Sequence, residues 1–261
     1  MKLTKVFALT ALATLVSTNA LAEKIKVGVM AGPEHEVAEV AAKVAKEKYG
    51  LDVEYVLFND YALPNSAVAS KDLDANAMQH KPYLDKDSQE KGLKNLVIVG
   101  NTFVYPLAGY SKKIKHVDEL KDGDVVAVPN DPSNLARALI LLEKQGLIKL
   151  KDNTNLFSTT LDIVENPKNL KIKEVDTSVA ARALDDVTLA VVNNTYAGQV
   201  GLTIEDGVFV EDKDSPYVNI IVAREDNKDS KAIQNFVKAY QTDEVEAEAK
   251  KHFKDGVVKG W

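Results

Sequence analysis

The chain has 261 residues, with 33 lysines and arginines, 39 aspartates and glutamates, and no cysteine. A formal net charge of −6 and an isoelectric point near 5.4 argue against nucleic-acid binding, which requires a basic surface. Without cysteine the chain forms no disulfide, so its stability must come from core burial.

Residues 1–22 have the pattern of a cleavable secretory signal. Two lysines precede an apolar run from Val6 to Val16, and the small-x-small sequence Ala20-Leu21-Ala22 follows a polar break. The apolar run is too short to span a bilayer. A lipoprotein signal would place a cysteine at the cleavage point, where this sequence has Glu23. We therefore expect a mature protein that begins near Glu23 and diffuses freely outside the cytoplasm.

A first cycle of strands and helices runs from residue 24 to residue 111. A β-branched run at 24–32 predicts a strand, and the next segment carries apolar residues at helical spacing until Gly50, a typical C-cap. The pattern recurs as a strand at 51–58, short helices at 64–70 and 82–91, and an extended apolar segment at 95–111.

A second cycle begins with a helical turn at 116–123. The pattern then predicts strands at 124–131 and 170–176, helices at 134–147 and 177–186, a strand leading into a helix at 188–199, an extended run at 218–226 and a helical tail at 229–253. Strands that alternate with helices indicate an α/β protein with parallel sheets and helices on both faces.

Two long extended segments, near 103–112 and 216–225, join the two cycles. Two crossing strands of this kind predict two lobes with a hinge and a cleft between them. We expect a discontinuous first lobe formed by residues 23–108 and 223–261, and a second lobe formed by residues 109–222.

No motif in the sequence nominates a catalytic centre. The G-x-S-x-G elbow, the P-loop and the G-x-G-x-x-G fingerprint are absent from the sequence. The histidines at positions 35, 80, 116 and 252 fall in no metal-ligand spacing, and the acidic residues are scattered. We predict no enzymatic activity, no catalytic residue, no metal site and no cofactor.

The segment VVAVPNDPSNLARALILLEKQGL holds the first ligand-binding candidate. Its predicted strand ends at three competent N-caps, Asp131, Ser133 and Asn134, and Gly146 closes the helix. A helix N-terminus favours an anion, and Arg137, expected in the first turn, can hold a carboxylate through two parallel hydrogen bonds. No acidic residue lies three or four positions from Arg137. The alternatives, an ion pair with a distant acid or exposure to solvent, stay open.

Two asparagines are further candidates. Asn193 follows a predicted buried strand, and ligands in open α/β sheets collect at the carboxyl ends of strands. An amide both donates and accepts, which suits an α-amino group beside a carboxylate. Asn219 lies in a predicted strand, where asparagine is depleted. An ordinary turn or N-cap at Asn193 and a core hydrogen bond at Asn219 are the alternatives.

Aromatic residues gather in the first half of the chain, several of them near predicted strand ends. An aromatic-lined slot suits an apolar or thioether side chain, because sulfur packs well against ring edges. Each of these residues, taken singly, also suits the hydrophobic core. The group comprises Phe58, Tyr61, His80, Tyr83, Phe103 and Tyr105.

Five long motifs carry a resemblance to a known family. They are DANAMQHKPYLD (74–85), GNTFVYPLAGYSKKIK (100–115), AVPNDPSNLARALILL (127–142), VVENPKNLKI (163–172) and EDKDSPYVNIIVARED (211–226). With them the mature chain, to its C-terminal VKGW, resembles the methionine-binding proteins of ABC importers, the NlpA lipoprotein family. The resemblance implies a type II periplasmic-binding-protein fold, with two α/β lobes, two crossing strands and methionine closed in the central cleft.

The resemblance also implies roles for individual residues. Arg137 would bind the carboxylate of the amino acid, with Asn134 as a supporting polar contact. Asn193 and Asn219 would hold the amino and carboxylate groups. The thioether side chain would be surrounded by His80, Tyr83, Phe103 and Tyr105.

The implied partners are L-methionine or D-methionine and the membrane permease subunits of an ABC importer, and we expect a monomer in the periplasm. Members of the family carry a lipobox cysteine where this chain has Ala-Leu-Ala-Glu. This departure indicates a freely diffusing protein or an altered N-terminus in the source sequence. Alternative functions are the binding of a related amino acid or dipeptide, catalysis on the same two-lobed fold, and a surface or adhesive role.

Overall fold

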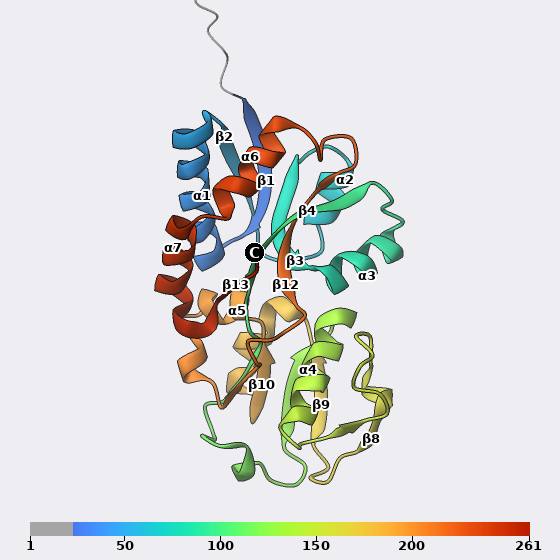
Figure 1. The fold of residues 1–261 in the computed structure, drawn as a ribbon. Helices are drawn as coiled ribbons and strands as arrows, with labels where there is room; N and C mark the ends of the chain where they lie inside the picture. Colours follow the sequence, from blue (N-terminus) through green and yellow to red (C-terminus); the bar gives the residue numbers. More distant parts are fainter. Residues whose placement is uncertain (1–22) are drawn as a thin grey trace, which may run out of the picture.

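The computed structural model of the protein describes residues 23–261, and the predicted signal sequence lies outside this range. Figure 1 shows two lobes, one above the other, each built on its own β-sheet. The predicted two-lobed α/β fold is confirmed. No helix within the described residues is long and apolar enough to span a membrane.

The first lobe contains a six-stranded sheet in the order β13-β4-β12-β3-β1-β2. Helices α1, α6 and α7 lie on one side of this sheet, and α2 and α3 lie on the other (Figure 1). The elements are β1 (Lys24–Met30), α1 (Pro33–Tyr49), β2 (Asp52–Phe58), α2 (Pro64–Ala69), β3 (Ala75–His80), α3 (Lys81–Lys91), β4 (Leu96–Val104), β12 (Val218–Arg224), α6 (Lys231–Tyr240), α7 (Asp243–Phe253), η5 (Lys254–Gly256) and β13 (Val258–Lys259).

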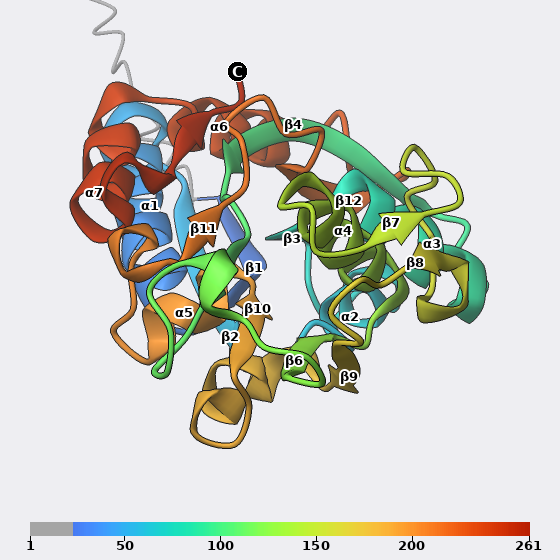
Figure 2. The same ribbon diagram turned by 90° about the horizontal axis from the view of Figure 1, so that it is seen from below.

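The second lobe contains a five-stranded sheet in the order β11-β5-β10-β6-β9, and a short antiparallel pair, β7-β8. Figure 2, seen from below, shows α4 and α5 on either side of β6 and β10. The elements are β5 (Ala108–Tyr110), η1 (Val117–Glu119), β6 (Val125–Pro129), α4 (Pro132–Lys144), β7 (Lys149–Leu150), η2 (Thr160–Asp162), β8 (Ile163–Glu165), β9 (Lys171–Val175), η3 (Thr177–Asp185), β10 (Leu189–Val192), α5 (Asn194–Gln199), η4 (Ile204–Asp206) and β11 (Phe209–Val210).

The prediction of wholly parallel sheets is wrong. Strand β1 is parallel to β2 and β3, and β6 is parallel to β9 and β10, as helical crossovers between strands require. Strand β12, however, is antiparallel to both of its neighbours, β3 and β4, and β5 is antiparallel to β10. The exceptions are the strands that follow the two crossings. Each enters its sheet from the other lobe instead of returning through a helix.

The chain crosses between the two sheets at residues 105–107 and 211–217, which separate β4 from β5 and β11 from β12. These crossings lie within or next to the two extended segments predicted from the sequence. The predicted lobe boundaries near 108 and 222 stay a prediction. The two crossing segments contact each other, because Glu211 N donates to Leu107 O at 2.8 Å.

Most predicted helices begin and end where the capping signals indicate. Helix α1 ends at Gly50, whose left-handed φ of 67° lets its N–H reach the last turn, and α3 ends at Gly92 in the same way. Two details differ. Residues 177–185 form a 3₁₀ helix, and the helical tail divides into α6 and α7 around Gln241 and Thr242.

Strand β3 was not predicted, because polar side chains interrupt its apolar pattern. All six of its residues are buried. Asn76 and Gln79 both donate to Asn65 Oδ1 of α2, and the Asn65 amide donates to Gln79 Oε1 and to Asp87 of α3. This closed network satisfies the buried polar groups and fixes β3 to α2 and α3. The strand therefore delivers its last residue, His80, to a defined place between the lobes.

Candidate functional site

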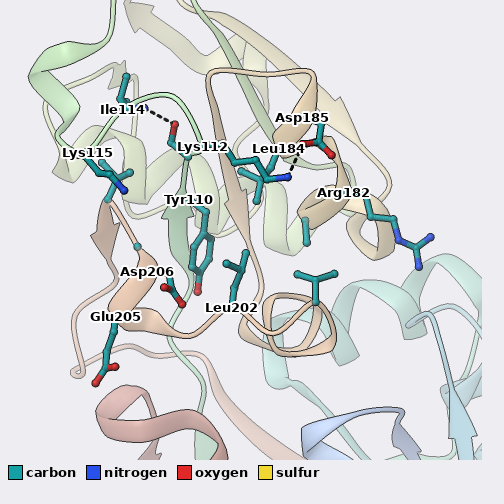
Figure 3. A pocket seen from close by; sticks show the side chains of 15 residues that line it. Tyr110, Lys112, Ile114, Lys115, Arg182, Leu184, Asp185, Leu202, Glu205 and Asp206 are labelled. Atoms are coloured by element: carbon teal, nitrogen blue, oxygen red, sulfur yellow. Dashed lines mark hydrogen bonds and ion pairs between the residues drawn. The ribbon is translucent and has the colours of Figure 1, made fainter.

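A large cavity in the second lobe lies apart from the predicted ligand-binding residues. It has a volume of about 710 Å³. Figure 3 shows Lys112 paired with Asp185 on one side of it, and Tyr110, Leu202 and Asp206 on another. None of the eight residues predicted to bind the ligand lines this cavity.

A second, nearly closed cavity of about 20 Å³ lies between the lobes. Seven of the eight predicted ligand-binding residues line it: His80, Tyr83, Tyr105, Asn134, Arg137, Asn193 and Asn219. The exception is Phe103, which is fully buried in the first-lobe core, with its ring centroid 4.9 Å from that of Trp261. We take this inter-lobe cavity as the candidate functional site.

Arg137 lies one turn later in its helix than the sequence indicated. Asp131 is the N-cap of α4, and the helix begins at Pro132, so Arg137 is its sixth residue and belongs to the second turn. Asp131 accepts hydrogen bonds from the backbone N–H and side chain of Asn134 at 3.0 Å, and from Thr177 Oγ1 at 2.7 Å. The N-cap thus holds Asn134 toward the cavity.

The guanidinium of Arg137 has a protein counter-ion, Glu211, 74 positions away along the chain. Nε of Arg137 lies 2.9 Å from Glu211 Oε1, Nη2 pairs with Glu211 Oε2, and both side chains are buried. Our argument that this cation needs a ligand's charge is therefore wrong. The alternative of an ion pair with a distant acid describes the structure.

The same guanidinium is held by both crossing segments. Nη2 donates to Tyr105 O at 3.0 Å, and the ring of Tyr217 lies 4.4 Å from Arg137 Cζ. Glu211 also accepts from Leu107 N at 3.1 Å. These contacts engage Nε and Nη2, whereas Nη1 has no acceptor among residues 23–261. One nitrogen of a rigidly held guanidinium is therefore available at the cavity wall.

His80 is held neutral at the cavity. Burial, reinforced by the charge of Arg137, lowers the pKa of His80 to about 3. Nδ1 accepts from Tyr83 N at 3.2 Å, so the proton is on Nε2, which donates to Asn134 Oδ1 at 3.2 Å. Because His80 ends β3 in the first lobe and Asn134 belongs to α4 in the second, this hydrogen bond joins the lobes across the cavity.

Asn193 presents an unused acceptor. Its Nδ2 donates to Asn134 Oδ1 at 2.8 Å. Its Oδ1 is buried and has no hydrogen-bond partner among the described residues. A buried amide oxygen without a donor is costly, so this atom is suited to a ligand N–H. Asn219 stands directly opposite His80 in the antiparallel pairing of β12 with β3.

Aromatic rings enclose the rest of the cavity. Tyr61 packs against Tyr83 and Tyr196 with ring centroids 5.7 and 5.1 Å apart, and His80 packs against Tyr217 at 5.0 Å. Tyr83 OH donates to Tyr61 O at 2.9 Å, which fixes the first of these pairs. The aromatic slot predicted from the sequence is therefore present, formed in part by rings from the second half of the chain.

Five further residues line the cavity: Tyr61, Met78, Gln79, Asn194 and Thr195. Met78 and Gln79 could not be found, because β3 itself was not predicted. Tyr61 belonged to the predicted aromatic group without an assigned role. Asn194 and Thr195 directly follow Asn193, and the strand-end signal that selected Asn193 also covers them.

The arrangement suits binding and contains no reacting set. One cationic nitrogen, one buried amide oxygen and a wall of rings complement a small molecule that has an anionic group, an N–H donor and an apolar part. All of these groups are held by hydrogen bonds to other residues. The site is therefore pre-organised, which reduces the entropy lost on binding.

Residues 25–261 match the family model described as NlpA lipoprotein. Outer membrane lipoprotein 1 of Mannheimia haemolytica is 82% identical over 239 residues, which cover 91% of this chain and 86% of that protein. The D-methionine-binding lipoprotein MetQ of Escherichia coli K12 is 65% identical over 240 residues, 91% of this chain and 88% of the relative. A nutrient-binding protein from Burkholderia cenocepacia, solved bound to methionine, superposes with a TM-score of 0.88 at 48% identity, covering 91% of this chain and all of that one.

Proposed function

Because the chain belongs to the NlpA lipoprotein family, we propose that it is the substrate-binding protein of an ABC importer and that its ligand is methionine. The relatives named above are binding proteins, and this chain is likewise a binding protein and not an enzyme. The observation that carries the proposal is the inter-lobe cavity. Its free polar atoms, Arg137 Nη1 and Asn193 Oδ1, complement the two charged ends of an α-amino acid.

In the proposed complex the ligand carboxylate binds Nη1 of Arg137, and Asn134 and Asn219 supply supporting polar contacts. The ammonium group donates to Asn193 Oδ1, which otherwise has no donor among the described residues. The thioether chain lies among Tyr83, Tyr105 and the neutral ring of His80. Phe103 supports Tyr105 from behind, since their ring centroids are 5.9 Å apart.

A zwitterion suits the electrostatics of this cavity. Arg137 and Glu211 already neutralise each other, and His80 is uncharged. A ligand with a net charge would introduce an unpaired charge into a buried site, whereas an amino acid with a neutral side chain introduces none. This favours methionine over acidic or basic amino acids.

Delivery of the ligand would follow the two-lobed design. The lobes close over methionine, water is excluded, and the closed protein docks on the permease subunits in the inner membrane. We place the protein in the periplasm. The relatives are named lipoproteins, whereas this sequence has no cysteine, so any anchoring would require a route other than a lipidated cysteine.

Calorimetric titration tests this function. Protein unfolded and refolded to remove co-purified ligand should bind L-methionine with one site per chain. D-methionine titrated in parallel decides the stereochemical preference, and glutamate and lysine serve as charged controls. The absence of both heat and a thermal shift with either methionine enantiomer would refute the proposed ligand.

A further inference from the structure

A buried carboxylate of the first lobe reaches across to the second lobe beside the binding cavity. Glu34 lies in the first turn of α1 and is only 3% exposed. Its Oε1 accepts a hydrogen bond from the hydroxyl of Thr195, in α5 of the second lobe. Figure 1 shows α5 directly below α1. Glu34 does not line the cavity, but Thr195 does.

Thr195 connects Glu34 to a second residue of the cavity wall. Tyr61 OH donates to Thr195 Oγ1 at 3.1 Å. The Thr195 hydroxyl has one hydrogen, which it donates to Glu34, so Tyr61 must act as the donor toward Thr195. The three groups form a directional chain that ends at the carboxylate. Its direction fixes the Tyr61 hydroxyl hydrogen away from the cavity.

This chain is part of the contact between the lobes. Tyr61 and Glu34 belong to the first lobe and Thr195 to the second, so opening the cleft breaks both hydrogen bonds. Nearby, Gln199 Nε2 of α5 donates to Ala31 O, just before α1, at 2.9 Å. Separation of the lobes would admit water to Glu34, whose burial depends on the approach of α5.

No cation pairs with Glu34 among the described residues, and the groups that face it are neutral. Thr195 and the tyrosines Tyr61, Tyr105, Tyr196 and Tyr240 surround it, and its negative charge raises the pKa of all four tyrosines. On its own helix, His35 pairs with Glu39 and Glu36 contacts His252. Burial raises the pKa of Glu34 to about 7, and the Thr195 hydrogen bond only partly opposes this.

We propose that Glu34 is a positioning residue for ligand capture, which orients Thr195 and Tyr61, joins the lobes in the closed form and couples closure to the uptake of a proton. This inference rests on the proposed function, because it concerns capture at the same cavity. Glu34 contacts no ligand and acts through Thr195.

The direction of the proton coupling follows from the two states. In the closed form Glu34 has a pKa of about 7, and in a hydrated open cleft it returns toward its ordinary value of 4.5. Between these values the closed form holds the proton and the open form does not, so a fall in pH favours closure. From pH 8 to pH 6, Glu34 alone tightens binding about tenfold.

His80 acts in the opposite direction over part of this range. Its pKa is about 3 in the closed cavity and returns toward 6.5 in water, so closure releases a proton from His80 as the pH falls below about 6.5. The contribution of Glu34 must therefore be read as a difference between the wild type and a Glu34 variant.

The test measures the dissociation constant for L-methionine from pH 6 to pH 8 for wild type, Glu34→Gln and Glu36→Gln. The amide of Glu34→Gln keeps an acceptor for Thr195 and cannot ionise. The variant should bind like the wild type at pH 6, relatively tighter at pH 8, and lack the roughly tenfold gain on acidification. Glu36→Gln makes the same chemical change two residues along α1, on an exposed side chain, and should keep the wild-type profile.

A second pair of variants tests the hydrogen-bonded chain itself. Thr195→Val removes the hydroxyl at nearly constant volume and should weaken binding about tenfold to a hundredfold, whereas Thr195→Ser should restore most of the affinity. Wild-type binding together with an unchanged pH profile in Glu34→Gln, or unchanged affinity in Thr195→Val, would overturn the inference. Failure of the wild type to bind methionine at any pH would overturn the proposed function instead, and this inference with it.

Discussion

The ion pair of Arg137 and Glu211 binds together parts of the chain that move relative to each other. Arg137 comes from α4, Glu211 from one crossing segment, and the guanidinium also bonds Tyr105 O on the other. Removing one member of a buried pair leaves the other charge without a partner, which costs about 3–5 kcal/mol. The side chain proposed to hold the ligand carboxylate therefore also contributes to folding.

Substitution of Arg137 should reduce both affinity and stability, and a second substitution should separate the two effects. Arg137→Met is expected to weaken methionine binding about a hundredfold or more and to lower the free energy of unfolding by about 3–5 kcal/mol. The double variant with Glu211→Gln removes the orphaned charge, so its stability should recover while its affinity does not. Calorimetry and urea unfolding measure the two quantities. Wild-type affinity in Arg137→Met would remove Arg137 from the site.

At the scale of the element, α4 is the helix whose N-terminus shapes the site. Its N-cap, Asp131, accepts from Asn134 and from Thr177 of η3. Asn134 Oδ1 in turn accepts from His80 and Asn193. One capping carboxylate thus sets the direction of a polar chain that runs from the second lobe to the first.

Loss of this cap should affect affinity as well as stability. Asp131→Ala is expected to cost about 1 kcal/mol of stability as a lost N-cap and also to release Asn134, which weakens methionine binding. Ser230→Ala is the matched control, because Ser230 caps α6 by accepting from Ile233 N at 3.3 Å and lies far from the cavity lining. Thermal unfolding should shift in both variants. Equal affinities in the two variants would show that Asp131 acts only as a helix cap.

Elements with local signals could be predicted from the sequence, and those with distant partners could not. Helix α1 was found because its apolar spacing and Gly50 lie within one short segment. Strand β3 was missed because the groups that satisfy Asn76 and Gln79 come from other elements. The position of Glu211 beside Arg137 likewise depends on the folding of 74 intervening positions. Most cavity residues were identified through the family resemblance, whereas their hydrogen-bond partners required the structure.

At the scale of the whole molecule, two buried titratable groups oppose each other. Glu34 has a pKa of about 7 in the fold and an ordinary value of 4.5, so it stabilises the fold as the pH falls from 7 toward 4.5. His80 has a pKa of about 3 in the fold and an ordinary value of 6.5, so it destabilises the fold as the pH falls below 6.5. Between pH 4.5 and 6.5 the two contributions have opposite signs and largely cancel.

Removal of one group should therefore expose the other. Between pH 6.5 and 4.5 the stability of the ligand-free wild type, relative to His80→Gln, should fall by about 1.4 kcal/mol per pH unit, because only the wild type must protonate this histidine on unfolding. His116→Gln, at an exposed histidine, should show no such slope. Urea unfolding at several pH values measures the difference. A flat difference for His80→Gln would mean that His80 is not held neutral.

The C-terminal end of the chain has an optical consequence. Trp261 is the single tryptophan of the sequence, and its ring lies 4.9 Å from Phe103 on β4, just before the first crossing segment. Gly260 N donates to Thr102 O at 2.9 Å, which fastens the terminus to the same strand. All indole fluorescence of the protein thus originates beside the hinge. Its emission offers a label-free record of the lobes opening and closing, including rates that equilibrium titrations do not provide.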